Sequence, residues 1–282
     1  MSCLAEQAKI LVAEAEENNL ERQPRWNRWH TCGLCEQGYY GVVACALGWA
    51  CWKTYVGLPE TDAARVNAMR VLGNGLSEAK LHEDALFVYQ AELSMERRLG
   101  APDDHILVVQ ANLAITYGEL GDSERALSME QEVYSGRLKL NGVEHESTLI
   151  AASNYAAELI DLKRFKEAKS VLRKTMPVAR RVLGDSTDTT LRMRWLYAVA
   201  LYDDDGALDD LCEAVTTLEE LERIARRVLG DAHPNTRGIE VALQEAREAL
   251  RACEVQDAFR TAHTKLAAQT LADASAKPSP DA

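Results

Sequence analysis

The sequence repeats itself, and this periodicity restricts the possible folds more than any other feature does. Four similar segments end one unit and begin the next: RRLGAPDDHIL, LKLNGVEHESTL, RRVLGDSTDTTL and RRVLGDAHPNTR. Their glycines Gly100, Gly142 and Gly184 are 42 residues apart, and Gly230 follows after 46. A repeat of 20 to 50 residues is typical of an elongated array of stacked modules. We therefore expect a repeat protein and not a single globular core.

Each repeat has the pattern of two helices joined by a short turn. In one repeat, apolar residues recur at helical spacing between positions 107 and 120. Gly121 then permits the left-handed backbone that often ends a helix, and Asp122 or Ser123 can cap the next one. No segment shows the alternation of a strand. The sequence predicts an all-α fold, a right-handed α-solenoid of tandem helix-turn-helix repeats.

The repeat register divides the chain into five segments. We expect a capping helix within residues 1–25 and a degenerate, cysteine-rich first repeat at 26–60. Repeats of about 42 residues follow at 61–232, and a second capping helix at 233–272 covers the last of them. Residues 273–282 are rich in Pro, Ser and Ala, which predicts a disordered tail.

Charge and hydropathy exclude several classes of partner. The net charge of −12 and the pI of about 5.1 are the opposite of a basic nucleic-acid-binding surface. They favour a protein partner of basic character. The start of the chain lacks a signal-peptide pattern, and the longest apolar stretch, residues 42–52, is far shorter than a membrane span. We expect a cytoplasmic protein that contacts neither nucleic acid nor membrane.

The repeat motifs resemble a known family. The segment from Asn112 to Gly121 reads Asn-Leu-Ala-x-x-Tyr-x-x-x-Gly and looks like a tetratricopeptide repeat. The 42-residue period and the loop Leu229–Thr236, LGDAHPNT, are similar to the kinesin light chain type. The resemblance covers residues 26–250. It implies a non-catalytic scaffold or adaptor that binds a peptide or protein partner in the concave groove. Kinesin light chains carry a long coiled coil before the repeats. The first two dozen residues here show no sustained heptads, so we do not expect motor association.

The same resemblance places candidate binding residues on the first helix of each repeat. Family members use an Asn before a Leu-Ala pair to hold a peptide backbone or carboxylate, and Asn112 and Asn154 occupy that position here. The ladder is incomplete, since Val71 and Leu196 stand at the corresponding places. Five further residues share the groove register: Asn67, Arg70, Asn74, Arg192 and Trp195. An alternative role for Asn112 and Asn154 is an inter-helix hydrogen bond that fixes packing.

The cysteine-rich segment allows two interpretations. His30, Cys32 and Cys35 could bind zinc together with Cys45 or Cys51, because Cys-x-x-Cys is half of a tetrahedral site. This would make the segment an adaptor similar to a MYND-type zinc finger. In the other interpretation, residues 34–40 form the turn and 42–56 the second helix of a degenerate repeat. The cysteines are then buried hydrophobic residues, and we expect no metal.

No pattern of catalytic residues emerges. His145 and His233 recur at one loop position, which favours a structural role in the turn. The pairs Arg97-Arg98, Arg180-Arg181 and Arg226-Arg227 each close a second helix, where cations complement the helix dipole. A phosphate-binding loop, a nucleophile elbow and a His-Glu-x-x-His motif are all missing. We predict that the protein is not an enzyme and needs no cofactor.

Overall fold

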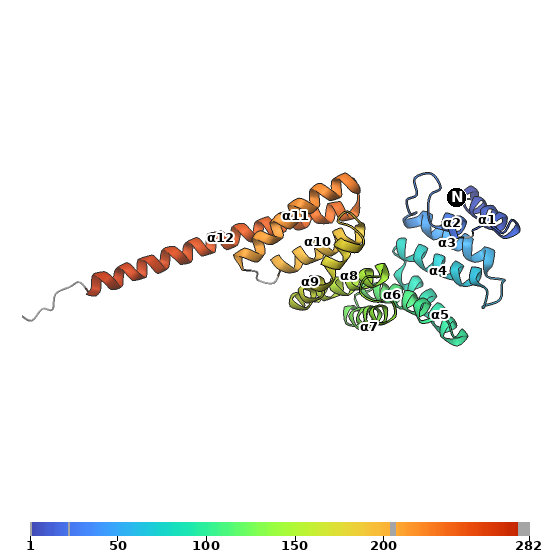
Figure 1. Ribbon diagram of the computed structural model, residues 1–282, viewed down its shortest axis with the longest axis horizontal. Helices are drawn as coiled ribbons and strands as arrows, with labels where there is room; N and C mark the ends of the chain where they lie inside the picture. Colours follow the sequence, from blue (N-terminus) through green and yellow to red (C-terminus); the bar gives the residue numbers. More distant parts are fainter. Residues whose placement is uncertain (1, 22, 204–206, 276–282) are drawn as a thin grey trace, which may run out of the picture. The chain divides into compact units, whose positions relative to one another are not determined.

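The chain folds into paired α-helices, as a computed structural model shows for residues 2–21, 23–203 and 207–275 (Figure 1). It divides into two compact units at Gly142 and Val143. The described residues contain no β-strand, although Thr31 and Gly38 form one isolated antiparallel bridge. None of the described helices is both long and apolar enough to cross a membrane. The predicted all-α, solenoid-type repeat fold is confirmed.

The first unit contains an N-terminal segment and two helix pairs. Successive helices from α3 to α7 pack against each other, and α1 packs against α2, η1 and α3. The elements are α1 (Ser2–Glu17), α2 (Gln23–Trp26), the 3-10 helix η1 (Asn27–Trp29), α3 (Gly41–Tyr55), α4 (Ala63–Glu78), α5 (His82–Leu99), α6 (Asp103–Glu119) and α7 (Ser123–Asn141).

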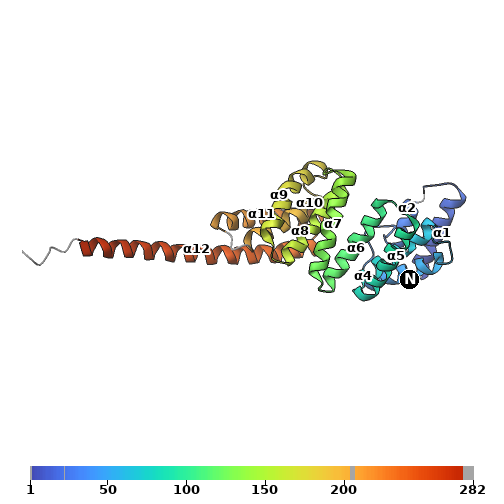
Figure 2. The same cartoon turned by 90° about the horizontal axis from the view of Figure 1, so that it is seen from below.

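The second unit contains two further helix pairs and a long last helix (Figure 2). Its elements are α8 (Glu146–Asp161), α9 (Phe165–Val182), α10 (Asp188–Tyr202), α11 (Leu208–Val228) and α12 (Pro234–Ser275). The first helices of successive repeats also touch, since α10 contacts both α8 and α12. A layer of fully buried leucines at Leu172, Leu218 and Leu221 lies inside this unit.

The repeating glycines occupy equivalent places in the fold. Gly100, Gly142, Gly184 and Gly230 each follow a second helix, with φ angles of 67°, 79°, 94° and 87°. Only glycine reaches this region without a steric penalty, so the 42-residue spacing marks the ends of the repeats. Gly57 shares the register but lacks a positive φ, because α3 ends in a different turn.

The recurring histidines cap helices. The Nδ1 atom of His145 accepts a hydrogen bond of 3.2 Å from the Ser147 amide at the start of α8. His233 Nδ1 accepts one of the same length from the Asn235 amide at the start of α12. A capping acceptor satisfies one of the unpaired amides in the first turn. The prediction of a structural role for these residues is confirmed.

The cysteine-rich repeat is more degenerate than its sequence indicated. Its second helix is α3, close to the predicted 42–56, but its first helix shrinks to α2 and η1 before a loop that contains Gly33 and Gly38. Trp26 and Trp29 fill the space and pack on Tyr55, with ring centroids 5.2 and 6.1 Å away. Large aromatic side chains bury enough area to replace a full helical turn.

The cysteines do not all behave as core residues. Cys51 is fully buried in α3, as predicted, but Cys35 is exposed in the loop, and Cys32 and Cys45 are half-buried. The expectation that these cysteines are uniformly buried is therefore wrong. It assumed a complete first helix that would have covered the loop.

The last helix covers α11 only with its first turns. Ile239, Ala242, Leu243 and Ala246 are buried, and most side chains described after residue 250 are exposed. The helix continues through residues 273–275, which the sequence assigned to a disordered tail. These three residues are Asp, Ala and Ser, and neither Pro nor Gly interrupts the helix there. Residues 276–282, the rest of that predicted tail, lie outside the described residues.

Candidate peptide-binding groove

A pocket of about 440 Å³ lies on α4 in the first unit. Three predicted groove residues, Asn67, Arg70 and Asn74, share it with the aromatic N-terminal segment. The remaining wall comes from α2, η1, the loop that follows and α3: Gln23, Trp26, Trp29, His30, Gly38, Tyr39, Tyr40 and Ala44. Apolar walls with a few polar groups are typical of recognition sites.

A second pocket of about 480 Å³ continues along the same helix. It also contains Gln23, Asn67 and Arg70, so the two pockets meet at these three residues. At its far end lie Leu99 and His105. The two together form a groove along α4, which we call the α4 groove.

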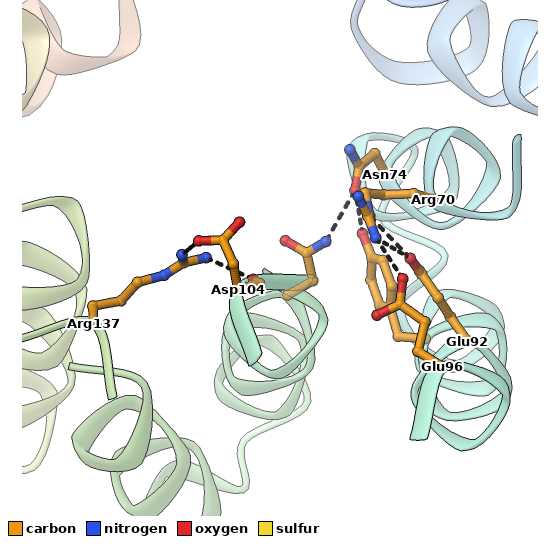
Figure 3. A network of polar contacts seen from close by, with 8 residues as sticks. Arg70, Asn74, Glu92, Glu96, Asp104 and Arg137 are labelled. Atoms are coloured by element: carbon orange, nitrogen blue, oxygen red, sulfur yellow. Dashed lines mark hydrogen bonds and ion pairs between the residues drawn. The ribbon is translucent and has the colours of Figure 1, made fainter. Parts of the chain in front are cut away.

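Arg70 is held from below by two carboxylates of α5. Its Nε donates to Glu92 Oε1 at 2.9 Å and its Nη2 to Glu96 Oε1 at 2.9 Å (Figure 3). Glu92 is 0% exposed and Glu96 2%, and the second oxygen of each has no hydrogen-bond partner in the part of the chain that the structure describes. Burial raises the pKa of Glu92 to about 7, although Arg70 opposes the rise. The Arg70 guanidinium therefore pairs with carboxylates of its own repeat.

Amide side chains link α4 to α6 at the groove floor. The Tyr89 hydroxyl donates to Asn74 Oδ1 at 2.7 Å, and Asn112 Nδ2 reaches the same oxygen at 3.4 Å. These contacts occupy the carbonyl oxygen of Asn74 and one N–H of Asn112. The Asn74 NH₂ group and the Asn112 carbonyl remain to pair with a ligand.

Asn67 differs from the other amides. Across the described part of the chain its side chain makes no hydrogen bond, and it is half-buried where the two pockets meet. An amide offers two donors and an acceptor, so this position can satisfy both groups of a peptide unit.

The other three predicted residues lie in the second unit. Arg192 Nη1 donates to Asn154 Oδ1 at 2.7 Å, and Asn154 is 8% exposed. Trp195 lines a separate pocket of about 610 Å³ between α8, α10 and α12. Its Nε1 is buried and has no hydrogen-bond partner among residues 2–21, 23–203 and 207–275. The seven predicted residues thus fall into two groups, one in each unit.

The two aligned asparagines make the same kind of contact. Asn112 bonds to Asn74 and Asn154 to Arg192, in each case across 38 residues to the first helix of a neighbouring repeat. These are the inter-helix hydrogen bonds of the packing alternative. Burial of Asn154 supports that role for it, while Asn112 is half-buried beside the α4 groove.

The cysteine-rich segment does not assemble a metal site. Within the described ranges, no group of three or more His, Cys, Asp or Glu side chains could hold a metal ion. Hydrogen bonds from the Cys35 and Leu34 backbone lower the pKa of Cys32, so these two cysteines stay close. Cys51 lies in the core, where burial raises the pKa of its thiol.

Sequence reasoning missed Glu92 and Glu96, and a signal was present. An alanine recurs in the second helices, at Ala85, Ala126, Ala168 and Ala214. Glu92 and Glu96 follow Ala85 by seven and eleven residues, where α9 has Thr175 and Ala179 and α11 has Leu221 and Ala225. A charge where other repeats carry small or apolar residues predicts a buried ion pair. Trp26 and Trp29 were missed as groove residues because the first helix of their repeat is almost absent.

Comparison with protein families supports the repeat assignment. The tetratricopeptide repeat profile matches residues 106–147 and 148–188. No curated protein sequence matches the chain. Residues 106–188 of this chain therefore match two tetratricopeptide repeats.

Solved structures of low sequence identity share the fold. BtubC (BKLC) from P. vanneervenii has a TM-score of 0.60 at 16% identity, with 85% of this chain and 94% of that chain covered. Kinesin light chain-like TPR repeats from Podosopora anserina have a TM-score of 0.53 at 19% identity, covering 70% and 96%. The apo form of RapI has a TM-score of 0.52 at 14% identity, covering 74% and 76%. Kinesin light chain-like TPR domains are thus among its structural neighbours.

Proposed function

We propose that the protein is a non-catalytic interaction module that binds an extended segment of a protein partner along the α4 groove. Tetratricopeptide repeat domains generally serve as protein-interaction scaffolds. The groove combines aromatic walls for side chains with amides that can hold a peptide backbone. Asn67 and Asn74 contact the backbone, and Asn112 extends the row onto α6.

One observation carries the proposal. The Asn67 amide, half-buried where the two pockets meet, has no hydrogen-bond partner among the described residues. A polar group that is partly removed from water without a partner loses free energy, and a bound peptide restores the missing hydrogen bonds. No hydrogen bond within the described ranges accounts for the position of Asn67.

A binding role also agrees with the titratable groups. Shifted pKa values often mark catalytic residues, but structural ion pairs cause them too. Glu92, whose pKa is about 7, is fully buried under Arg70, where no substrate atom can reach it. We propose a cytoplasmic adaptor without catalysis or a cofactor.

Affinity purification from the source cells tests the groove. Tagged wild type and the Asn67→Ala variant are compared by quantitative mass spectrometry, and we expect at least a tenfold loss of specific partners in the variant. Asn67→Ala removes no internal hydrogen bond, so its melting temperature should equal that of wild type.

Two further variants complete the design. Asn112→Ala should weaken recovery less, because only its carbonyl faces the ligand. Asn18→Ala is the matched control, since Asn18 is exposed and bonds only to Glu14 in α1. Equal recovery by wild type, Asn67→Ala and Asn112→Ala would contradict binding in the α4 groove.

A further inference from the structure

The outer part of α12 carries an apolar stripe that this chain leaves exposed. Val255 is 71% exposed, Phe259 73% and Leu266 62%. Figure 2 shows α12 running on past α11. Single exposed apolar residues are ordinary, but several on one helix face indicate a contact surface.

The stripe follows a strict heptad spacing. Steps of four and three residues alternate without a break along eight positions. They are Val241, Glu245, Glu248, Ala252, Val255, Phe259, Ala262 and Leu266. At 3.6 residues per turn, all eight lie on one face and span about 37 Å. Within this spacing the positions from Ala252 to Leu266 are all apolar, and this run of about two heptads forms a face that can pack against another helix.

The inner end of the stripe borders the Trp195 pocket. Val241, which is 58% exposed, and Glu245 line that pocket together with Trp195. Acidic groups collect there: Asp161 and Asp203 also line it, against the cations Lys163 and Arg237. Burial and the nearby Glu245 raise the pKa of Asp203, as expected where negative charges crowd. Glu248 adds one more exposed acid a turn further out.

A second copy of this chain fits the stripe poorly. Parallel pairing in register would place Glu245 and Glu248 against their own copies. Antiparallel pairing over the full stripe would place Glu248 against Phe259 and Glu245 against Ala262. Like charges in contact and carboxylates on apolar groups both cost free energy.

We propose that the stripe from Val241 to Leu266 docks an amphipathic helix of a partner protein. That helix presents apolar residues to Val255, Phe259 and Leu266, and basic residues to Glu245 and Glu248. The surface is distinct from the α4 groove, and it stands even if the groove binds nothing.

Synthetic peptides test the proposal with the full chain. Each has 25 residues, with leucines at alternating spacings of three and four and a pair of lysines at one end. Both end-to-end orders are made, as are versions with glutamates in place of the lysines. Fluorescence anisotropy of labelled peptides measures binding. We expect one lysine peptide to bind at least tenfold more tightly than its glutamate counterpart.

Variants of α12 locate the binding. Phe259→Asp should weaken the lysine peptide at least tenfold, and Glu248→Lys should abolish the charge preference, because the new lysine offsets the charge of Glu245. Thr261→Asp, on the opposite face, is the matched control and should bind as wild type does. Phe259 is exposed, so the variant should keep the wild-type helix content, which circular dichroism checks. Val255→Asp is the second variant for the same surface.

Three outcomes would overturn the proposal. Equal binding of lysine and glutamate peptides would remove the charge argument. Unchanged binding to Phe259→Asp and Val255→Asp would place the peptide elsewhere. A wild-type dimer in analytical ultracentrifugation that Phe259→Asp dissociates would show that a second copy covers the stripe.

Discussion

The second helices of the two units carry different residues at the same buried positions. In α9 and α11 the places four, seven and eleven residues after the recurrent alanine are apolar or small. They are Leu172, Thr175 and Ala179 in α9, and Leu218, Leu221 and Ala225 in α11. In α5 and α7 charged residues enter the same places. The three places hold Tyr89, Glu92 and Glu96 in α5 and Glu130, Val133 and Arg137 in α7, so four of these six residues are charged.

Three of the buried ionic groups in the first unit, Glu92, Glu96 and Arg137, pair with a residue of the preceding helix. Arg70 of α4 binds Glu92 and Glu96, and Asp104 of α6 binds Arg137 (Figure 3). A repeat therefore tolerates charge in its interior where the neighbouring helix supplies the opposite charge. Such pairs seldom add stability over apolar packing, but loss of one partner leaves a buried charge. The first unit should be the more sensitive to single charge removals.

The largest effect is expected at Arg70. Arg70→Met leaves Glu92 and Glu96 buried without a cation, which should lower the free energy of unfolding of the first unit by about 3–5 kcal/mol at pH 8. Urea denaturation, with hydrogen exchange followed by mass spectrometry, would assign the loss to α4 and α5.

Arg97→Met is the matched control for this change. Arg97 is exposed in the last turn of the same helix pair, so its removal should cost less than about 0.5 kcal/mol. If both variants are equally stable, the ion pair does not hold the first unit together.

The second-largest effect is expected in the pH dependence of the stability of the first unit. Folded Glu92 keeps its proton up to about pH 7, whereas the unfolded chain releases it near the ordinary value of 4.5. The contribution of Glu92 to the free energy of unfolding is thus fully present below pH 4.5, the ordinary pKa, and is lost as the pH rises through 7. Between pH 5 and 8 the loss should reach up to about 3 kcal/mol.

Glu92→Gln isolates this contribution. The amide does not titrate, so the variant should gain stability relative to wild type as the pH rises from 5 to 8. Denaturant unfolding at several pH values measures both slopes. Parallel slopes for wild type and variant would show that Glu92 stays ionised throughout.

The repeat architecture was predictable because backbone requirements leave strong marks in a sequence. Gly100, Gly142, Gly184 and Gly230 are needed wherever the chain turns left-handed, and their spacing alone reveals the period. Caps such as His145 and His233 are equally local. The turn at residues 34–40 was predicted, but the exposure of Cys35 was not, because Trp26 and Trp29 replace a helix through long-range packing that no local pattern records.

The groove was harder to predict than the fold. Register alone placed Asn67, Arg70 and Asn74 on one helix, and they do share a pocket. Register could not show that Arg70 is occupied by Glu92 and Glu96 while Asn67 has no hydrogen-bond partner among the described residues. Those differences depend on which side chains of α5 lie opposite each α4 residue, and the repeat register does not give that information.

Two glycines packed against aromatic rings, one in each unit, allow a finer comparison of how rigidly the two units are packed. A Cβ at Gly73 would lie 2.5 Å from the Tyr89 ring, and one at Gly238 would lie 2.5 Å from the Trp195 ring. Tyr89 is 2% exposed and hydrogen-bonded to Asn74, so its ring cannot yield. Trp195 borders a pocket of about 610 Å³ into which its ring can shift.

Gly73→Ala should therefore destabilise the first unit by about 1–3 kcal/mol through overpacking. Gly238→Ala should cost less than about 1 kcal/mol, because alanine favours the helix by a similar amount. Thermal unfolding of both variants gives the order, and Gly57→Ala, which meets no atom within 4 Å, is the neutral control. A larger loss for Gly238→Ala would mean that Trp195 is fixed as firmly as Tyr89, and the contrast between the units would then be confined to charge.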